Sequence, residues 1–185
     1  MIILYRFLLG MLKNKQKAYV YNFVDHASNW SFKRAYERIN TKNTADFVRR
    51  LLVACPFKIK RLQTDNGTEF TFKWISEFSD DPKIHPLMKI CHEEDIKHKL
   101  IPPGEKELQG LVERSHRQDD QELFSRIEPN DIDEFQAHLT EYMNFRNSSR
   151  RFKKLNWLTP DMWLVKYNKL KKCEITDESV VKLVA

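Results

Sequence analysis

The chain has 185 residues and a mass of 22.2 kDa, which suits one compact domain with a short extension. Hydrophobic residues make up 41% of the chain and charged residues 31%, and this composition excludes disordered and collagen-like proteins. The 32 Lys and Arg residues exceed the 26 Asp and Glu residues, giving a net charge of +6. A polyanion is therefore the first partner to consider.

The cysteines and the N-terminal run bear on the cellular compartment. Cys55, Cys91 and Cys173 are far apart and include no Cys-x-x-Cys pair, which excludes zinc-finger spacing and a disulfide framework and fits a reducing cytosol. The first twelve residues are apolar at ten positions, but the run is too short to span a bilayer and Arg6 lies inside it. We therefore expect neither a membrane anchor nor a signal peptide.

The first half of the chain alternates strand and helix patterns. Residues 18–24 and 30–39 are rich in β-branched and aromatic side chains and flank a turn-like segment, which predicts two paired strands. Apolar residues recur at helical spacing over 44–55, which predicts an amphipathic helix that the following proline ends. A strand is expected over 57–64, because an Asp-Asn-Gly turn signal follows it.

The second half is mainly helical. Its expected elements are helices around 74–78 and 86–94, a short strand near 98–101, a long helix from Glu107 past Phe124, a helix capped by Asn130 whose apolar stripe reaches Met143, and a helix opened by Thr159-Pro160. Strands interleaved with helices predict an α/β sheet with helices on both faces. Such a sheet places ligands beyond the ends of its strands.

Asp65 is the first candidate site residue. It stands at the tip of an expected strand, with a glycine turn beyond it at 65–67. A carboxylate in that place can share a hard divalent cation with a phosphate. Because Asp-Asn-Gly is also a common turn sequence, a purely structural turn is the alternative interpretation.

Glu113 is the second candidate, within the sequence QGLVER at 109–114 near the start of the long helix. It lies beside the apolar stripe, on a face shared with His116 and Arg117. Gly110 costs about 1 kcal/mol relative to alanine in a helix, which indicates either a close approach of another group or a frayed helix start. A solvent-exposed helical glutamate is the alternative interpretation of Glu113.

Taken in order, these motifs resemble the catalytic core of the DDE transposase and integrase family, which includes insertion-sequence transposases and retroviral-type integrases. The resemblance is carried by YNFVDHAS at 21–28, TDNGTEF at 64–70, QGLVERSH at 109–116 and FRNSSRRFKKLNWLTPDMWL at 145–164. It implies a ribonuclease-H-like mixed sheet flanked by helices, with a C-terminal helical and basic extension. The implied division is a catalytic core over 1–147 and a basic segment with the Thr-Pro helix over 148–185.

The resemblance also implies a metal site, in which three carboxylates hold two Mg²⁺ or Mn²⁺ ions for phosphodiester strand transfer. By motif match Asp65 is the second carboxylate and Glu113 the third. The family's first carboxylate belongs to the first core strand, but residues 1–24 contain neither Asp nor Glu. We interpret this absence as a truncation in or near that strand, although the first twelve residues could still supply most of it. Asp25 is a poor substitute, since it matches the turn after the second strand.

The expected function follows from this pattern. The chain is expected to be an integrase or transposase catalytic domain for DNA integration, inactive by itself because the first Asp is missing. The alternative is a non-catalytic fragment that binds DNA or pairs with a full-length transposase. DNA and further copies of the chain are the expected partners, in a bacterial cytosol or nucleoid, with no membrane and no small-molecule substrate.

Basic residues are the expected DNA contacts. Over residues 146–172 there are nine Lys and Arg residues against one acid, although a solvated helix surface would look the same. Arg114 and Arg117 follow Glu113 on the long helix, where Asp119 and Asp120 interrupt the basic pattern. The candidate DNA-binding residues are Arg114, Arg117, Arg150, Arg151, Lys153 and Lys154.

Overall fold

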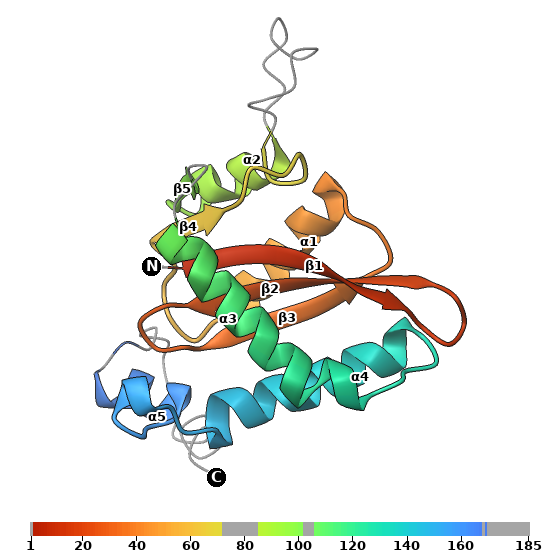
Figure 1. Cartoon of the computed structure of the whole chain (residues 1–185). Coiled ribbons are helices and arrows are strands. Elements are labelled where there is room, and N and C mark those ends of the chain that lie inside the picture. The colour runs from red at the N-terminus through yellow and green to blue at the C-terminus, as the bar shows by residue number, and fades with distance from the viewer. Residues whose placement is uncertain (1, 72–84, 102–105, 168, 170–185) are drawn as a thin grey trace, which may run out of the picture.

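Five strands form one mixed sheet with β1 (Ile2–Met11) at its centre, antiparallel to β2 and parallel to β4 (Figure 1). The order across the sheet is β3-β2-β1-β4-β5. The computed structural model describes residues 2–71, 85–101, 106–167 and 169, with side chains for those outside 2–11 and 106–113. The other strands are β2 (Lys17–Asp25), β3 (Ser31–Tyr36), β4 (Arg61–Thr64) and β5 (Lys97–Leu100).

Alternate residues of β2 contribute to two cores on opposite faces of the sheet. Tyr21 and Phe23 pack with residues of α1 and α2, whereas Ala18 and Val20 pack with residues of α4 and of the segment after α3. Figure 1 shows α3 crossing in front of the sheet and α4 running below it, along β3. The helices are α1 (Thr41–Ala54), α2 (Pro86–Glu93), α3 (Lys106–Glu122), α4 (Ile132–Asn144) and α5 (Pro160–Lys166). Over the described residues, none is long and apolar enough to cross a membrane.

Local sequence sets the beginnings of α1 and α5. Asn40 Oδ1 accepts a hydrogen bond from Asn43 N at 2.7 Å, and Thr159 Oγ1 accepts one from Met162 N at 3.2 Å. Each helix therefore begins at a polar N-cap. Pro160 fits the first position of α5 because its missing N–H needs no partner there. Both helices confirm the sequence prediction.

The free edge of β3 is covered by side chains rather than by another strand. Ser31 N donates to Asn147 Oδ1 at 3.0 Å, and Asn147 Nδ2 donates back to Ser31 O at 2.9 Å. Further along, Ala35 N donates to Gln136 Oε1 at 2.9 Å. Because Gln136 and Asn147 come from α4 and the turn after it, this segment blocks the edge against pairing with another chain.

Two predicted boundaries are wrong for packing reasons. The strand expected over 57–64 enters the ladder only at Arg61–Thr64, because Phe57 and Ile59 are buried in the core with α1 before the strand begins. The long helix ends at Glu122 and gives way to a tight 3-10 turn over Phe124–Arg126. The helix expected around 74–78 lies outside the described residues.

The N-cap predicted for α4 is also wrong by one residue. Asp131 caps the helix, since its Oδ1 accepts a hydrogen bond from Glu134 N at 2.9 Å. Asn130 instead donates its backbone N–H to Glu134 Oε2 at 2.7 Å. The two bonds form a reciprocal pair that leaves both backbone donors satisfied.

Candidate functional site

Asp65 lies directly after β4, at the edge where β4 and β5 both end. Thr64 pairs with Leu100 in the parallel ladder, and Ile101 N donates to Thr64 O at 2.8 Å. Asp65 Oδ1 accepts a hydrogen bond from Gly67 N at 2.9 Å, so this carboxylate holds the turn. The predicted turn is therefore present, and the role of Asp65 as a site residue stays a prediction. Its half-buried place at a strand end is the one expected for a ligand-binding residue.

The turn also encloses a buried acid that the sequence analysis did not single out. A Cβ on Gly67 would lie 2.5 Å from Glu69 Oε1, and Glu69 is only 3% exposed. The carboxylate of Glu69 is thus folded over the turn, where only a residue without a side chain leaves room for it. The motif TDNGTEF contains Glu69 and was the signal that could have found it.

Two histidines near this edge are held neutral by burial. Thr64 Oγ1 lies 2.9 Å from His98 Nε2, and burial, with a smaller effect of His85, lowers the pKa of His98 to about 4. Burial also lowers the pKa of His85, whose Nδ1 accepts a hydrogen bond from Leu87 N at the start of α2. Neither imidazole therefore brings positive charge to this edge at neutral pH.

The neighbouring strand brings no acid to Asp65. Ile3 pairs with Gln63 and Leu4 with Thr64, so the register continued by one residue sets Tyr5 beside Asp65. The sequence of β1, IILYRFLLGM, contains neither Asp nor Glu. Among the described residues, no group of three or more His, Cys, Asp or Glu residues is placed to hold a metal ion. The residues described at this edge therefore do not fit a two-metal site.

Glu113 lies in the first half of α3, and its side chain is outside the described part of the chain. The helix begins five residues after Ile101, so its first residue lies within about 18 Å of the edge that carries Asp65. Figure 1 shows α3 crossing the near face of the sheet from this end. The structure thus brings the helix of Glu113 to the Asp65 edge, and the convergence of the two carboxylates stays a prediction.

Asp25 lies apart from this edge and has a structural role. It pairs with Ile2, which places it about 10 Å along the strand from residue 5 and about 10 Å across two strands from β4. Its Oδ2 accepts hydrogen bonds from both the N–H and the hydroxyl of Ser28, each at 2.8 Å. Asp25 therefore caps the turn between β2 and β3.

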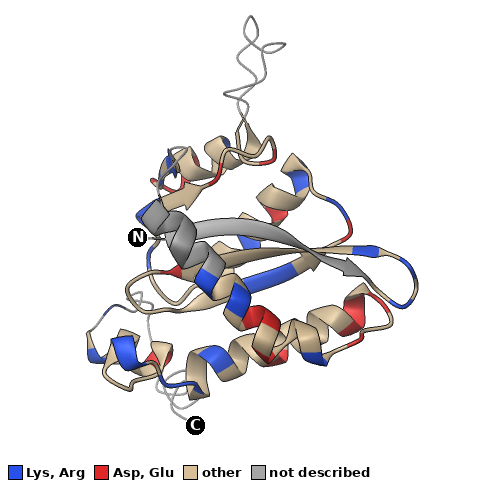
Figure 2. Cartoon of the chain, viewed as in Figure 1, with Lys and Arg blue, Asp and Glu red and all other residues tan. Residues whose placement is uncertain are grey.

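The structure brings part of the basic C-terminal segment to α3. Lys154 Nζ donates to His26 O, and burial together with the charge of Arg114 lowers the pKa of Lys154, against the raising effect of Asp25. Arg114 and Lys154, forty residues apart in sequence, thus act on each other electrostatically. Figure 2 shows Lys and Arg residues along the middle of α3 and around α5. The side chains of Arg114, Arg117, Arg151, Lys153 and Lys154 are exposed.

Two arginines of the same segment are turned inward. Arg150 forms an ion pair with Glu122 of α3, and its side chain is 26% exposed. Arg146 is buried and its Nη1 donates to Gln118 Oε1 at 3.0 Å. Both guanidinium groups also lie over the ring of Phe152, at 5.3 and 5.2 Å from its centroid. These two arginines bind the segment to α3, so their charge is already paired or buried within the chain.

A buried ion pair between β3 and α3 was missed by the sequence analysis. Lys33 Nζ lies 2.6 Å from Asp119 Oδ2, and neither side chain is exposed. Asn22 Nδ2 and the hydroxyl of Tyr142 each donate to the Asp119 carboxylate at 3.1 Å. Burial lowers the pKa of Lys33 to about 8, against the raising effect of Asp119.

The inward position of Asp119 had a signal in the sequence. Leu108, Val112, Ser115 and Asp119 follow the spacing i, i+4, i+7 and i+11, so Asp119 continues the apolar stripe of α3. Only Asp120 of the two aspartates is exposed. The prediction that Asp119 interrupts the exposed basic face is therefore wrong, because its carboxylate is buried and neutralises Lys33.

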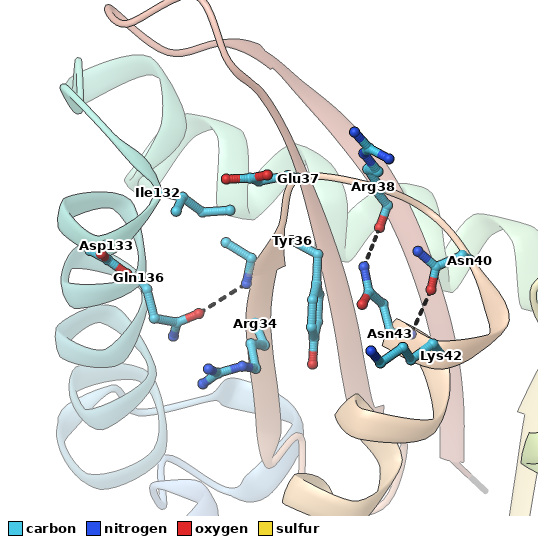
Figure 3. Close-up of a pocket in the computed structure, with 11 residues that line it drawn as sticks. Arg34, Tyr36, Glu37, Arg38, Asn40, Lys42, Asn43, Ile132, Asp133 and Gln136 are labelled. Atoms are coloured by element: carbon cyan, nitrogen blue, oxygen red, sulfur yellow. Dashed lines mark hydrogen bonds between the residues drawn. The ribbon is translucent and has the colours of Figure 1, made fainter.

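A pocket of about 460 Å³ lies at the other edge of the sheet, between β3, the start of α1 and α4 (Figure 3). Arg34, Arg38 and Lys42 line it together with the acids Glu37 and Asp133. Because β2 and β1 separate β3 from β4, this pocket is distinct from the Asp65 edge.

Comparison with known proteins gives consistent matches. Two protein-family models, each described as integrase core domain, match residues 7–106 and 94–160. The ORF3 protein of Spiroplasma virus SpV1-C74, which is named as an integrase, is 26% identical over 151 residues. The match covers 78% of this chain and 41% of the ORF3 protein, so the chain spans less than half of that relative.

Similar solved structures are retroviral integrases. The catalytic core domain of BIV integrase is 19% identical with a TM-score of 0.63, and the match covers 90% of this chain and 95% of that one. The HTLV-2 integrase core with magnesium, in a trimeric form, is 16% identical with a TM-score of 0.59, at 85% and 92% coverage. A simian T-cell lymphotropic virus intasome in complex with PP2A regulatory subunit B56 gamma is 16% identical with a TM-score of 0.60, at 81% and 49% coverage. These likenesses show the ribonuclease-H-like fold.

Proposed function

Because the chain belongs to the integrase core domain family, we propose that it is a DNA-binding integrase or transposase core whose acidic site lacks one carboxylate and does not catalyse strand transfer by itself. The observation that carries this proposal is the register between β1 and β4. It sets Tyr5 beside Asp65, on a strand that contains no acid.

The charge of the site supports the loss of activity. The family and the magnesium in a similar structure suggest divalent metal use. Two metal ions that clamp both oxygens of a phosphodiester displacement need several anionic ligands. Asp65 and Glu113 supply at most two carboxylates, and one oxygen of Asp65 already accepts from Gly67. We therefore assign no metal-dependent step to this chain.

DNA binding is supported by the exposed cations on and near α3. Arg114 and Arg117 lie on the helix of Glu113, and the basic segment adds Arg151, Lys153 and Lys154. Contacts of this kind position the phosphate backbone without reading bases. Arg150 is left out of the proposed contacts because its partner is Glu122. The intasome and the trimeric form among the similar structures support self-association as a further part of the proposal.

The first test measures binding of the purified chain to duplex DNA at several salt concentrations. We expect affinity that does not depend on sequence and falls with salt, with a log–log slope of about −4 to −5 if all five cations contact phosphates. Binding that is absent, or that does not change with salt, would contradict the DNA-binding part of the proposal.

The second test restores the missing acid. With Mg²⁺ or Mn²⁺, the native chain should neither nick DNA nor transfer strands, whereas Tyr5→Asp should gain metal-dependent nicking that Asp65→Asn then removes. Phe7→Asp is the matched control, since it adds an acid to the same strand two residues beyond the register position of Asp65. Nicking by the native chain that is lost in Asp65→Asn would show that the acidic site is complete.

A further inference from the structure

Trp157 is an exposed aromatic side chain on the basic segment. Its side chain is 61% exposed, whereas Trp30 is buried and Trp163 is half-buried. An indole has a large apolar face and a polar N–H, so it can contact both apolar and polar groups of a partner.

The main chain that carries this ring is held in an ordered turn. Asn156 and Trp157 both lie in the left-handed region, with φ of 56° and 62°, which is disfavoured for a bulky residue. Trp157 N donates to Phe152 O at 3.0 Å, and Arg151 Nη1 donates to Trp157 O at 3.2 Å. Leu158 then pairs with Phe152 in a short bridge. Because the turn is already ordered, a partner that contacts the ring meets little entropic opposition.

The positive charge around the ring indicates an anionic partner. Arg151, Lys153 and Lys154 are exposed on the same turn, and residues 145–158 contain no Asp or Glu. The charge of Arg114 on α3 also acts on Lys154, where it lowers the pKa that burial has already lowered. A second copy of the chain docked here through the same surface would set like charges against each other. The surface therefore fits a polyanion that also offers a flat apolar face.

A nucleic acid strand has both properties, since phosphates alternate with bases and every base has a π-face. Inside a duplex both faces of every base are covered by neighbouring bases, and a blunt end leaves open only the outer face of its last base pair, so an unpaired base offers the ring the most accessible face. We propose that Trp157 stacks on an unpaired base of DNA held by Arg151, Lys153 and Lys154, so that the chain prefers DNA with a single-stranded end. This inference rests on the proposed DNA-binding function and names its substrate more closely.

The test compares two labelled DNAs by fluorescence anisotropy, a blunt duplex and the same duplex with a single-stranded overhang. The native chain should bind the overhang DNA more tightly. Trp157→Ala should weaken binding to the overhang DNA about tenfold, equal to about 1.4 kcal/mol, and leave binding to the blunt duplex nearly unchanged. Trp157→Phe should keep most of the preference, and Lys153→Gln should weaken binding to both DNAs alike.

A second measurement checks stacking directly. The overhang DNA should quench the tryptophan fluorescence of the native chain and quench that of Trp157→Phe much less. Val53→Ala is the matched control, because Val53 is 89% exposed on α1 and should change neither measurement. Equal affinity of Trp157→Ala and the native chain for the overhang DNA would overturn the inference, as would a change in oligomeric state without any change in binding. Duplex binding without a preference for the overhang would contradict this inference alone, whereas absence of all DNA binding would contradict the proposed function.

Discussion

The face of the sheet under α1 and the face under α3 are stabilised in different ways. Under α1, Tyr21, Phe47 and Leu51 are fully buried, and the rings of Tyr21 and Phe47 lie 5.6 Å apart. Under α3, an apolar core that includes Phe135 and Leu139 is joined by the buried ion pair of Lys33 and Asp119, whose carboxylate also accepts hydrogen bonds. The face under α1 is thus stabilised by apolar packing, whereas the face under α3 combines an apolar core with a buried ion pair.

The difference matters because α3 carries Glu113. Apolar contacts have no preferred direction, whereas buried charges must meet at one geometry or remain unpaired at high cost. The hydroxyl of Tyr142 lies 3.1 Å from Asp119 Oδ1 and 2.9 Å from Glu122 Oε2 and shares its single proton between them, and Glu122 pairs with Arg150. This network therefore joins α3 to α4 and to the basic segment, and we expect it to set the position of the candidate site.

The largest effect is expected from breaking the buried ion pair. Lys33→Met leaves Asp119 buried without its cation and should lower the free energy of unfolding by about 3–5 kcal/mol. The double variant Lys33→Met/Asp119→Leu should recover most of that loss, since an apolar pair can replace a buried ion pair. Urea unfolding of the three chains measures both values, and a double variant as unstable as the single one would contradict the pairing.

Truncating a buried apolar side chain under α1 should lower the free energy of unfolding by about as much as breaking the ion pair, but a second substitution should not restore it. Leu51→Ala removes a fully buried side chain next to Phe47 and should cost about 2–5 kcal/mol. Because no charge is involved, the loss should stay the same between pH 4 and 8, to within about 0.5 kcal/mol. Urea unfolding at several pH values checks this, and a loss that varies with pH would remove the distinction between the faces.

A smaller effect is expected from the hydroxyl of Tyr142. Tyr142→Phe keeps the ring but removes the one proton that Asp119 and Glu122 share, which should cost about 1–3 kcal/mol. Phe135→Leu on the same helix is the control for packing alone. Thermal unfolding measures the difference, and a Tyr142→Phe chain as stable as the native one would show that the network does not depend on this hydroxyl.

The smallest effect is expected on the pH dependence of stability, to which the carboxyl of Glu122 contributes. Burial raises the pKa of this carboxyl, but hydrogen bonds from Arg150 and Tyr142 outweigh it and hold the pKa below the ordinary 4.5. A lowered pKa means that the stabilisation is present above pH 4.5 and is lost as the pH falls through the lowered value. Glu122→Gln should therefore flatten the fall of the melting temperature in acid, whereas an unchanged pH profile would speak against the pair with Arg150.

Sequence patterns predicted the elements whose signals are local. The apolar spacing over 44–55 and the Thr159-Pro160 start gave α1 and α5, and the Asp-Asn-Gly signal gave the turn at Asp65. The strand over 57–64 was predicted too long, because whether an apolar residue enters a ladder or a core depends on its neighbours in space. For the candidate site, motif order gave Asp65 and Glu113, and the same motif contains Glu69, but only the structure shows that its carboxylate folds over Gly67.

The sequence by itself determined which acids are present, and so it determined that β1 brings none to the site. It also determined the helical stripes and caps, because these depend on residues within a few positions of one another. Only the tertiary structure decided that Lys33 meets Asp119, that Arg150 turns inward to Glu122, and that Lys154 donates to the backbone of His26. The two residues of each contact are at least 28 positions apart in the sequence. A charged side chain acquires a specific partner only when the packed sheet and helices bring a polar or oppositely charged group within a few ångströms.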